Sequence, residues 1–139
     1  MEYFDEAGII RADLLDKDAY DQANLFVKHY FNKRRNKNEV DSRESLSSAQ
    51  LRKFFSEFRQ LEKKVNTEGF DKVKPLIKMV KSKASYAANP SNPKIPEKFK
   101  EFLINNVNRI NEEREFQAFM LHFEAVVGFF YGIEGIKNN

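Results

Sequence analysis

The sequence predicts an all-α fold, organised as a single domain of about five helices. Along most of the chain, apolar residues recur at intervals of three and four, which is the spacing of one helix face. No segment shows the alternation of apolar and polar residues that is typical of a strand. The 139 residues are 41% hydrophobic and 14% aromatic, which is enough to form one core. One domain over residues 1–139 is therefore expected.

Residues 1–17 are acidic and loosely patterned, and a first helix is expected from Asp18 to about Lys37. Its apolar face is Ala23, Phe26, Val27 and Tyr30, and its basic end is Lys33, Arg34, Arg35 and Lys37. Acid at the start and base at the end suit the helix dipole, so these cations either stabilise the helix end or contact nucleic acid. Residues 38–45 are polar and are expected to be a linker or mobile loop. The acidic segment is either a flexible tail or a contact with another subunit, and the sequence leaves both open.

A second helix is expected from Ser47 to about Asn66, and its start is the most completely specified in the chain. Ser47 suits a helix N-cap, and Gln50 can bond back to the Ser47 amide as in a capping box. Leu46 can pack on Leu51 across the cap. The apolar face that follows is Leu51, Phe54, Phe55, Phe58, Leu61 and Val65, and the basic stripe beside it is Arg52, Arg59 and Lys63, flanked by Lys53 and Lys64. The three phenylalanines have core spacing, which favours packing over base stacking.

Gly69 predicts the end of the second helix, and a third helix is expected from about Phe70 to Ala88. Pro75 falls in its first turns, where a missing amide costs least. Three lysines at spacing i, i+4 and i+7 form a second basic row on this helix. They are Lys74, Lys78 and Lys81.

Residues 89–96, Asn-Pro-Ser-Asn-Pro-Lys-Ile-Pro, cannot continue a helix and are expected to form an interhelical loop. A fourth helix is expected from Pro96 or Glu97, and a fifth from near Asn111 to about Tyr131. The fifth helix is apolar on most sides, which predicts a central position in the bundle, with self-association as the alternative. The residues that would serve self-association are Leu121, Ala125 and Phe129.

The charges are distributed unevenly along the chain. Residues 1–27 hold two Lys and Arg against seven Asp and Glu, residues 28–100 hold nineteen against eight, and residues 101–139 hold three against six. The three segments therefore carry net charges of −5, +11 and −3. A polyanion such as RNA would meet a much stronger field at the middle segment than the total of +3 suggests.

No residue set in the sequence suggests catalysis or a resident metal or cofactor. The chain has no cysteine, and its two histidines, His29 and His122, lack a clear third ligand. The five glycines form no phosphate-binding loop. Without a long apolar run, and with an acidic start, the chain is expected to be cytoplasmic and not bound to membrane.

Two segments are distinctive in their order and spacing. The first is Ser47-Ser48-Ala49-Gln50-Leu51-Arg52-Lys53-Phe54, where a Ser-rich cap runs into a helix start. The second is residues 119–130, Phe-Met-Leu-His-Phe-Glu-Ala-Val-Val-Gly-Phe-Phe. Together they resemble the small-subunit family of type III-A CRISPR effector (Csm) complexes. The resemblance implies a noncatalytic helical bundle, present in more than one copy, that lines the groove where guide RNA pairs with target RNA and contacts other Csm subunits.

We therefore expect an RNA-backbone-binding subunit without enzymatic activity, active in antiviral defence and able to form homodimers or stacked oligomers. The residues expected to bind RNA are Arg52, Arg59 and Lys63 first, then Lys53, Lys78 and Lys81, then Lys33, Arg34 and Arg35. The alternative is a helical protein-interaction adaptor that self-associates and docks an acidic partner through its basic row. A hydrolase or nuclease is disfavoured, because no residue set supplies a metal site or an activated nucleophile.

Overall fold

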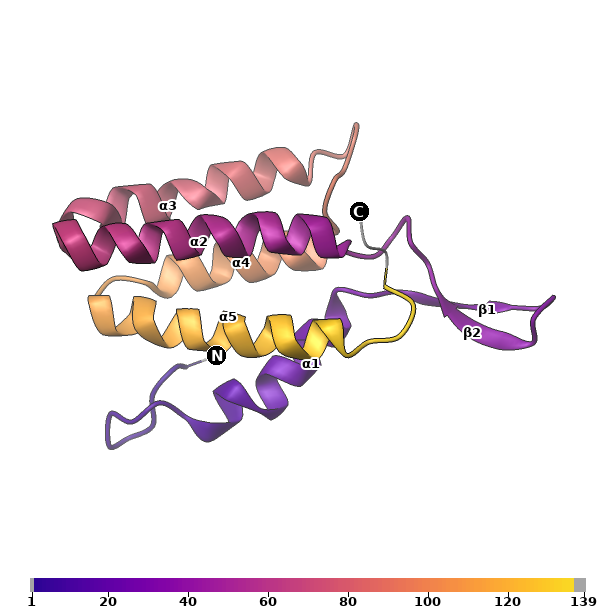
Figure 1. The fold of residues 1–139 in the computed structure, drawn as a ribbon, viewed down its shortest axis with the longest axis horizontal. Helices are drawn as coiled ribbons and strands as arrows, with labels where there is room; N and C mark the ends of the chain where they lie inside the picture. Colours follow the sequence, from indigo (N-terminus) through magenta and orange to yellow (C-terminus); the bar gives the residue numbers. More distant parts are fainter. Residues whose placement is uncertain (1, 137–139) are drawn as a thin grey trace.

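The computed structural model describes residues 2–136, which form five α-helices, a short 3-10 helix and a two-stranded sheet. The helices are α1 (Lys17–Leu25), α2 (Ser48–Glu68), α3 (Phe70–Ala87), α4 (Glu97–Arg109) and α5 (Glu113–Tyr131), and the 3-10 helix is Ala12–Leu15. Figure 1 shows α2 to α5 as a bundle, with α1 packed on the side of α5 that faces away from α2. The largely helical fold predicted from the sequence is confirmed, and the sheet was not predicted.

The predicted first helix is wrong beyond Leu25, where α1 ends. The chain then forms an antiparallel hairpin of β1 (His29–Asn32) and β2 (Lys37–Val40). The register places His29 opposite Val40 and Asn32 opposite Lys37. Because β2 takes up residues 37–40, the segment predicted as a linker over residues 38–45 is also partly strand.

The turn of the hairpin explains why the helix does not continue. The Asn32 side-chain oxygen accepts hydrogen bonds from the backbone N–H groups of Arg34, at 3.0 Å, and Arg35, at 3.3 Å. Asn36 has a φ of 51°, in the left-handed region that Asn tolerates better than most residues. An Asn side chain that satisfies the amides of its own turn competes directly with helix formation. This local chemistry prevailed over the apolar spacing that predicted a helix.

The second helix begins and ends as its sequence predicts, with one exception in the cap. The Ser47 hydroxyl accepts a hydrogen bond from the Gln50 N–H at 3.3 Å, and Gly69, with a φ of 92°, ends the helix. The expected return bond from Gln50 is wrong, because its side-chain oxygen is buried without a hydrogen-bond partner among residues 2–136. A reciprocal capping box occurs instead at α5, between Glu112 and Glu115. Helices α3 to α5 and the loop over residues 89–96 lie as predicted to within about two residues.

Aromatic side chains fill the core between the helices. Phe54 and Phe58 are buried, and the half-buried Phe55 ring lies 5.1 Å from Phe123 of α5. The Phe58 ring lies 4.9 Å from Phe119, also of α5. The α2 phenylalanines therefore pack in the core, as their spacing predicts, and α5 is central to the bundle.

The N-terminal segment packs against α4 and α5. The buried Tyr3 hydroxyl donates to the side-chain oxygen of Asn106 at 2.7 Å, and burial raises the Tyr3 pKa. Leu14 is fully buried, and its carbonyl lies 2.6 Å from Nδ1 of His122 on α5. The acidic residues of this segment are thus held on the side of the molecule away from α2 (Figure 1).

Candidate nucleic-acid interface

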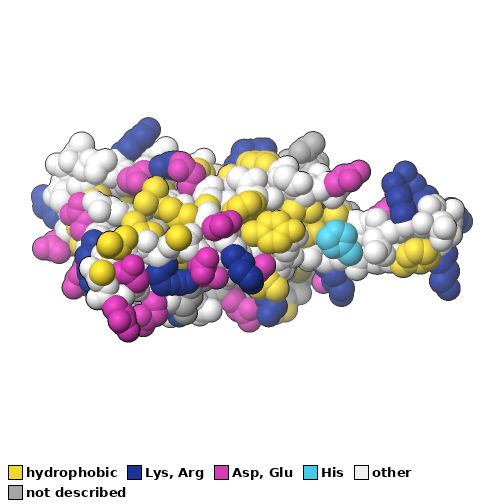
Figure 2. All heavy atoms as spheres, turned by 90° about the horizontal axis from the view of Figure 1, so that it is seen from below, with side chains coloured by type: hydrophobic (Ala, Val, Ile, Leu, Met, Phe, Trp, Pro, Cys, Tyr) yellow, Lys and Arg dark blue, Asp and Glu magenta, His cyan; other side chains and the backbone are white. Residues whose placement is uncertain are grey.

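The hairpin projects beyond one end of the bundle (Figure 1), and its turn holds a cluster of cationic residues. Lys33, Arg34 and Arg35, predicted to end a helix, are instead the exposed residues of the turn between β1 and β2. Arg35 forms an ion pair with Glu39 at 3.0 Å, whereas no carboxylate in the described part of the chain pairs with Lys33 or Arg34. Figure 2 shows Lys and Arg side chains gathered at this projecting end. The tip is therefore a compact cationic surface.

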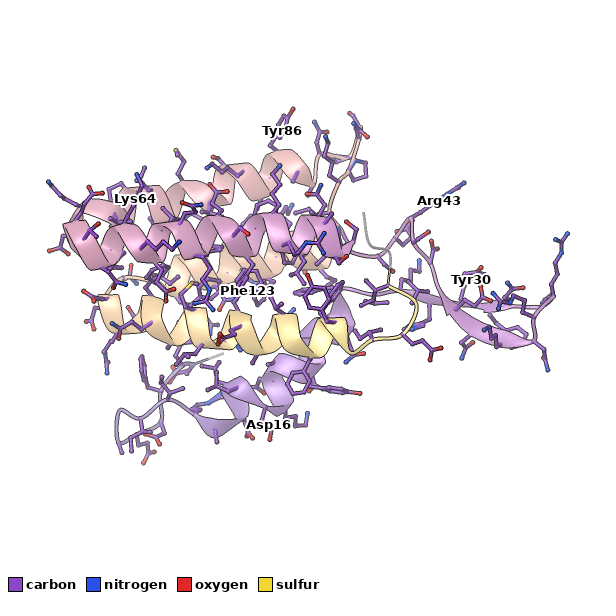
Figure 3. All side chains as sticks on the ribbon, viewed as in Figure 1. Asp16, Tyr30, Arg43, Lys64, Tyr86 and Phe123 are labelled. Atoms are coloured by element: carbon purple, nitrogen blue, oxygen red, sulfur yellow. The ribbon has the colours of Figure 1, made fainter. Side chains whose placement is uncertain are left out.

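The outer face of α2 carries a second group of cations. Arg52, Lys53 and Lys63 are exposed, and within residues 2–136 none of them is paired with a carboxylate. Arg52 does donate a long hydrogen bond, of 3.5 Å, to the Tyr131 hydroxyl. With a rise of about 1.5 Å per residue, Arg52 and Lys63 lie about 16 Å apart along the helix axis. In Figure 3, Lys64 lies near the end of α2 that is remote from the hairpin.

Arg59 lies on the same helix but already has anionic partners. Its guanidinium contacts Glu62 at 3.0 Å and Glu124 of α5 at 2.9 Å, and it lies 4.8 Å from the centre of the Phe55 ring. The hydrogen bond to Glu62, followed by the one to Glu124, raises the pKa of Arg59 against the effect of its partial burial. Arg59 therefore joins α2 to α5, and less of its charge is available to an external phosphate than the sequence suggested.

Lys78 and Lys81 of α3 point toward the C-terminal end of α4. Lys78 donates to the Val107 carbonyl and Lys81 to the side-chain oxygen of Asn108, each at 2.7 Å. The last carbonyls of a helix attract cations, so this contact stabilises the packing of α3 on α4. Burial, then repulsion from Lys81 and Lys74, lowers the pKa of Lys78. Lys78 and Lys81 of this basic row therefore mainly contact α4, and they contribute little free charge to the surface.

A comparison with protein families matches the Csm2 Type III-A family over residues 28–133. This chain belongs to that family. It is accordingly a small subunit of the type III-A Csm complex, where its partners are the other Cas proteins of that complex. No curated protein and no solved structure matches the chain. The family match begins at the hairpin and ends just after α5, so the hairpin belongs to the part that the Csm2 family shares.

The position of Arg43 was not predicted from the sequence. This exposed residue lies on the segment that joins the hairpin to α2, and its side chain extends into open space (Figure 3). It borders a hollow of about 720 Å³ that Lys94 also lines, together with Glu44 and Glu97. The hollow has mixed charge and does not by itself favour an anion. The Asn-rich turn of the hairpin was the sequence feature that could have indicated this position, because the returning strand brings Arg43 to the base of the hairpin.

The apolar residues proposed for self-association are partly covered by α1 of the same chain. Phe129 is half-buried, and its ring lies 5.5 Å from Tyr20 of α1 in an edge contact. Ala125 is half-buried as well, whereas Leu121 is 43% exposed. The three residues therefore do not form one open surface.

Within residues 2–136 the structure brings together no group of three or more His, Cys, Asp or Glu side chains suited to a metal ion. His29 is exposed on the hairpin, and His122 is buried in α5. None of the described helices combines the length and apolar character needed to cross a bilayer.

Proposed function

We propose that this Csm2-family subunit is a noncatalytic, RNA-backbone-binding component of a cytoplasmic type III-A interference ribonucleoprotein. It lines the groove in which guide RNA pairs with target RNA, bridges neighbouring subunits, and so serves antiviral defence. One observation supports the RNA contact most strongly. The hairpin tip and the outer face of α2 both expose cations without carboxylate partners in the described chain, and Arg43 lies between them.

This arrangement suits contacts with phosphates more than recognition of bases. Cations spread over about 16 Å of α2 can meet several phosphates along one strand, which positions the strand without reading its sequence. In RNA-guided complexes base pairing supplies sequence choice, and protein contacts follow the backbone and the shape of the duplex. A projecting cationic hairpin next to a cationic helix is compatible with that division of work.

The experiment is fluorescence anisotropy of single-stranded and double-stranded RNA over a series of salt concentrations. It compares the wild type with a triple variant on the outer face of α2 and with a control triple variant of equal charge change on other surfaces. The two variants are Arg52→Glu/Lys53→Glu/Lys63→Glu and Lys17→Glu/Lys72→Glu/Lys98→Glu.

The α2 variant should bind RNA more weakly, with a salt dependence that is flatter by about 0.7–0.9 for each phosphate that it no longer neutralises. The control variant should keep most of the affinity and the wild-type slope. Equal weakening in both variants would show that only net charge matters, and the assignment to α2 would be withdrawn. RNA incubated with the purified protein and Mg²⁺ should also stay intact, because the proposal contains no catalytic step.

A second candidate function, docking of an acidic protein segment, is favoured by a groove between α2 and α3. The groove is about 400 Å³ in volume, has Leu61, Leu76 and Met79 in its lining, and is bordered by Lys53, Lys64 and Lys83. Glu57 also lines it and forms an ion pair with Lys83. Leu76→Ser/Met79→Ser should impair a protein contact here and leave RNA affinity unchanged.

A further inference from the structure

The two faces of the hairpin differ in how their side chains are used. The register pairs Tyr30 with Glu39 on one face and Phe31 with Asn38 on the other. On the first face the Tyr30 hydroxyl donates to Glu39 at 3.3 Å, and Arg35 pairs with the same carboxylate at 3.0 Å. In Figure 3 the labelled Tyr30 lies on the hairpin, clear of the helices. The face that carries Phe31 has no such internal bonding among the described side chains.

Phe31 differs from every other phenylalanine in the chain. All fourteen lie within the described residues, and Phe31 is the one that is exposed, with 54% of its surface open to solvent. The other thirteen are buried or half-buried. The Phe31 ring makes no contact with another aromatic ring in residues 2–136. The fold therefore keeps a flat apolar ring in water at the end of a projecting element.

Lys33 and Arg34 are the cations that follow Phe31 in the chain, whereas the register places Lys37, opposite Asn32, on the Tyr30 face. All three are exposed, and no carboxylate in the described chain forms an ion pair with them. An exposed aromatic ring beside unpaired cations is the combination by which proteins bind single-stranded nucleic acid, with bases stacked on the ring and phosphates held by the cations.

We propose that Phe31 stacks on an unpaired base of single-stranded RNA while Lys33 and Arg34, which follow it in the turn, hold the adjacent phosphates. The inference rests on the proposed RNA-binding function and adds a base contact to it. Charge decides between the candidate occupants of this face. Two unpaired cations next to the ring in the turn favour a strand that offers an anion at every residue, and a protein contact becomes an outcome of the test.

The test uses full-length protein and two labelled RNAs, a 12-nucleotide uridine strand and a blunt 12-base-pair duplex, in anisotropy titrations. The diagnostic variants are Phe31→Val, which keeps strand propensity but removes the ring, and Phe31→Tyr, which keeps the ring. The expected result for Phe31→Val is a drop of about 5- to 100-fold in affinity for the single strand, with an unchanged salt slope. Phe31→Tyr should bind the single strand like the wild type, and both variants should bind the duplex as tightly as the wild type does.

The outcomes separate this inference from the proposed function. Binding of RNA by the wild type with no weakening in Phe31→Val would overturn the stacking and leave backbone binding intact. A similar drop for strand and duplex would also overturn it, because a duplex offers no unpaired base along its length. If Phe31→Val keeps RNA affinity but no longer retains a Csm protein partner in a pull-down, the face binds protein. Absence of any RNA binding by the wild type would remove both proposals.

Discussion

The buried histidine of α5 should make folding stability depend on pH in a predictable direction. His122 is fully buried, and its Nδ1–H donates to the Leu14 carbonyl at 2.6 Å. Its Nε2 is buried without a hydrogen-bond partner among the described residues. Protonation of Nε2 would therefore place a charge and a donor where no acceptor lies. Burial accordingly lowers the pKa of His122. Of the nearby Arg11–Asp18 ion pair, Asp18 raises this pKa and Arg11 lowers it.

The sign follows from comparing the two states. As the pH falls through about 6.5, His122 of the unfolded chain takes up a proton. In the folded protein His122 stays neutral until the pH reaches its lower pKa. The unfolded state then binds more protons, so stability falls with falling pH. The contribution of one histidine is limited to about 1.4 kcal/mol per pH unit, and it ends below the pKa of the folded state.

The assay is urea unfolding followed by far-ultraviolet circular dichroism, because the chain has no Trp. Wild type and His122→Asn are compared at pH 7.5, 6.5 and 5.5. Asn keeps a donor for the Leu14 carbonyl but does not titrate, so carboxylate effects are common to both proteins. The variant should be less stable at pH 7.5 because the smaller side chain fills the core less well, and the gap should narrow by up to about 1.4 kcal/mol between pH 6.5 and 5.5. A constant gap over this range would refute the reasoning.

Three further predictions concern single contacts. Glu124→Gln frees one side of Arg59 and should raise RNA affinity a few-fold in anisotropy titrations at low salt, and unchanged affinity would exclude Arg59 from the interface. Tyr3→Phe removes a buried hydroxyl bonded at 2.7 Å and should lower the free energy of unfolding by about 1–2 kcal/mol, measured in urea; an unchanged free energy would contradict this role of the bond. Gly69→Ala should lower the free energy of unfolding by about 1 kcal/mol or more, because Gly69 has a φ of 92°. Gly128→Ala, inside α5 with open space at the added Cβ, should raise it by about 0.5–1 kcal/mol. Changes of the same sign in both variants would contradict the argument.

Local sequence chemistry predicted most of the helices but not the hairpin. Ser47 and Gly69 mark the two ends of α2 through bonds and backbone angles that involve only nearby residues. The hairpin was not predicted because Ala23, Phe26 and Tyr30 have the spacing of a helix face. Each strand has four residues, which is too short for alternation to stand out. The informative signal was the pair of Asn residues at the turn, whose side-chain bonding and left-handed backbone favour a reversal of the chain.

The sequence predicted which residues form the candidate site better than it predicted how they are arranged. The cations of α2 lie on the outer face as expected, since helical spacing alone fixes that arrangement. Tertiary partners could not be anticipated: Arg59 meets Glu124, which is 65 residues away in sequence, and Lys78 meets the Val107 carbonyl, 29 residues away. Only the bond from Arg59 to Glu62, three residues along the same helix, follows from periodicity.

The separation of the acidic N-terminal segment from the cationic α2 and hairpin gives the molecule a permanent electric dipole. In Figure 3, Asp16 and Lys64 lie on opposite sides of the bundle, with α5 between them. In the field of a polyanion such a dipole exerts a torque on the diffusing protein before any contact forms. The subunit would thus arrive with α2 and the hairpin leading and its acidic side trailing, so fewer encounters begin in an unproductive orientation. This alignment weakens as salt shortens the screening length to about 8 Å near physiological ionic strength.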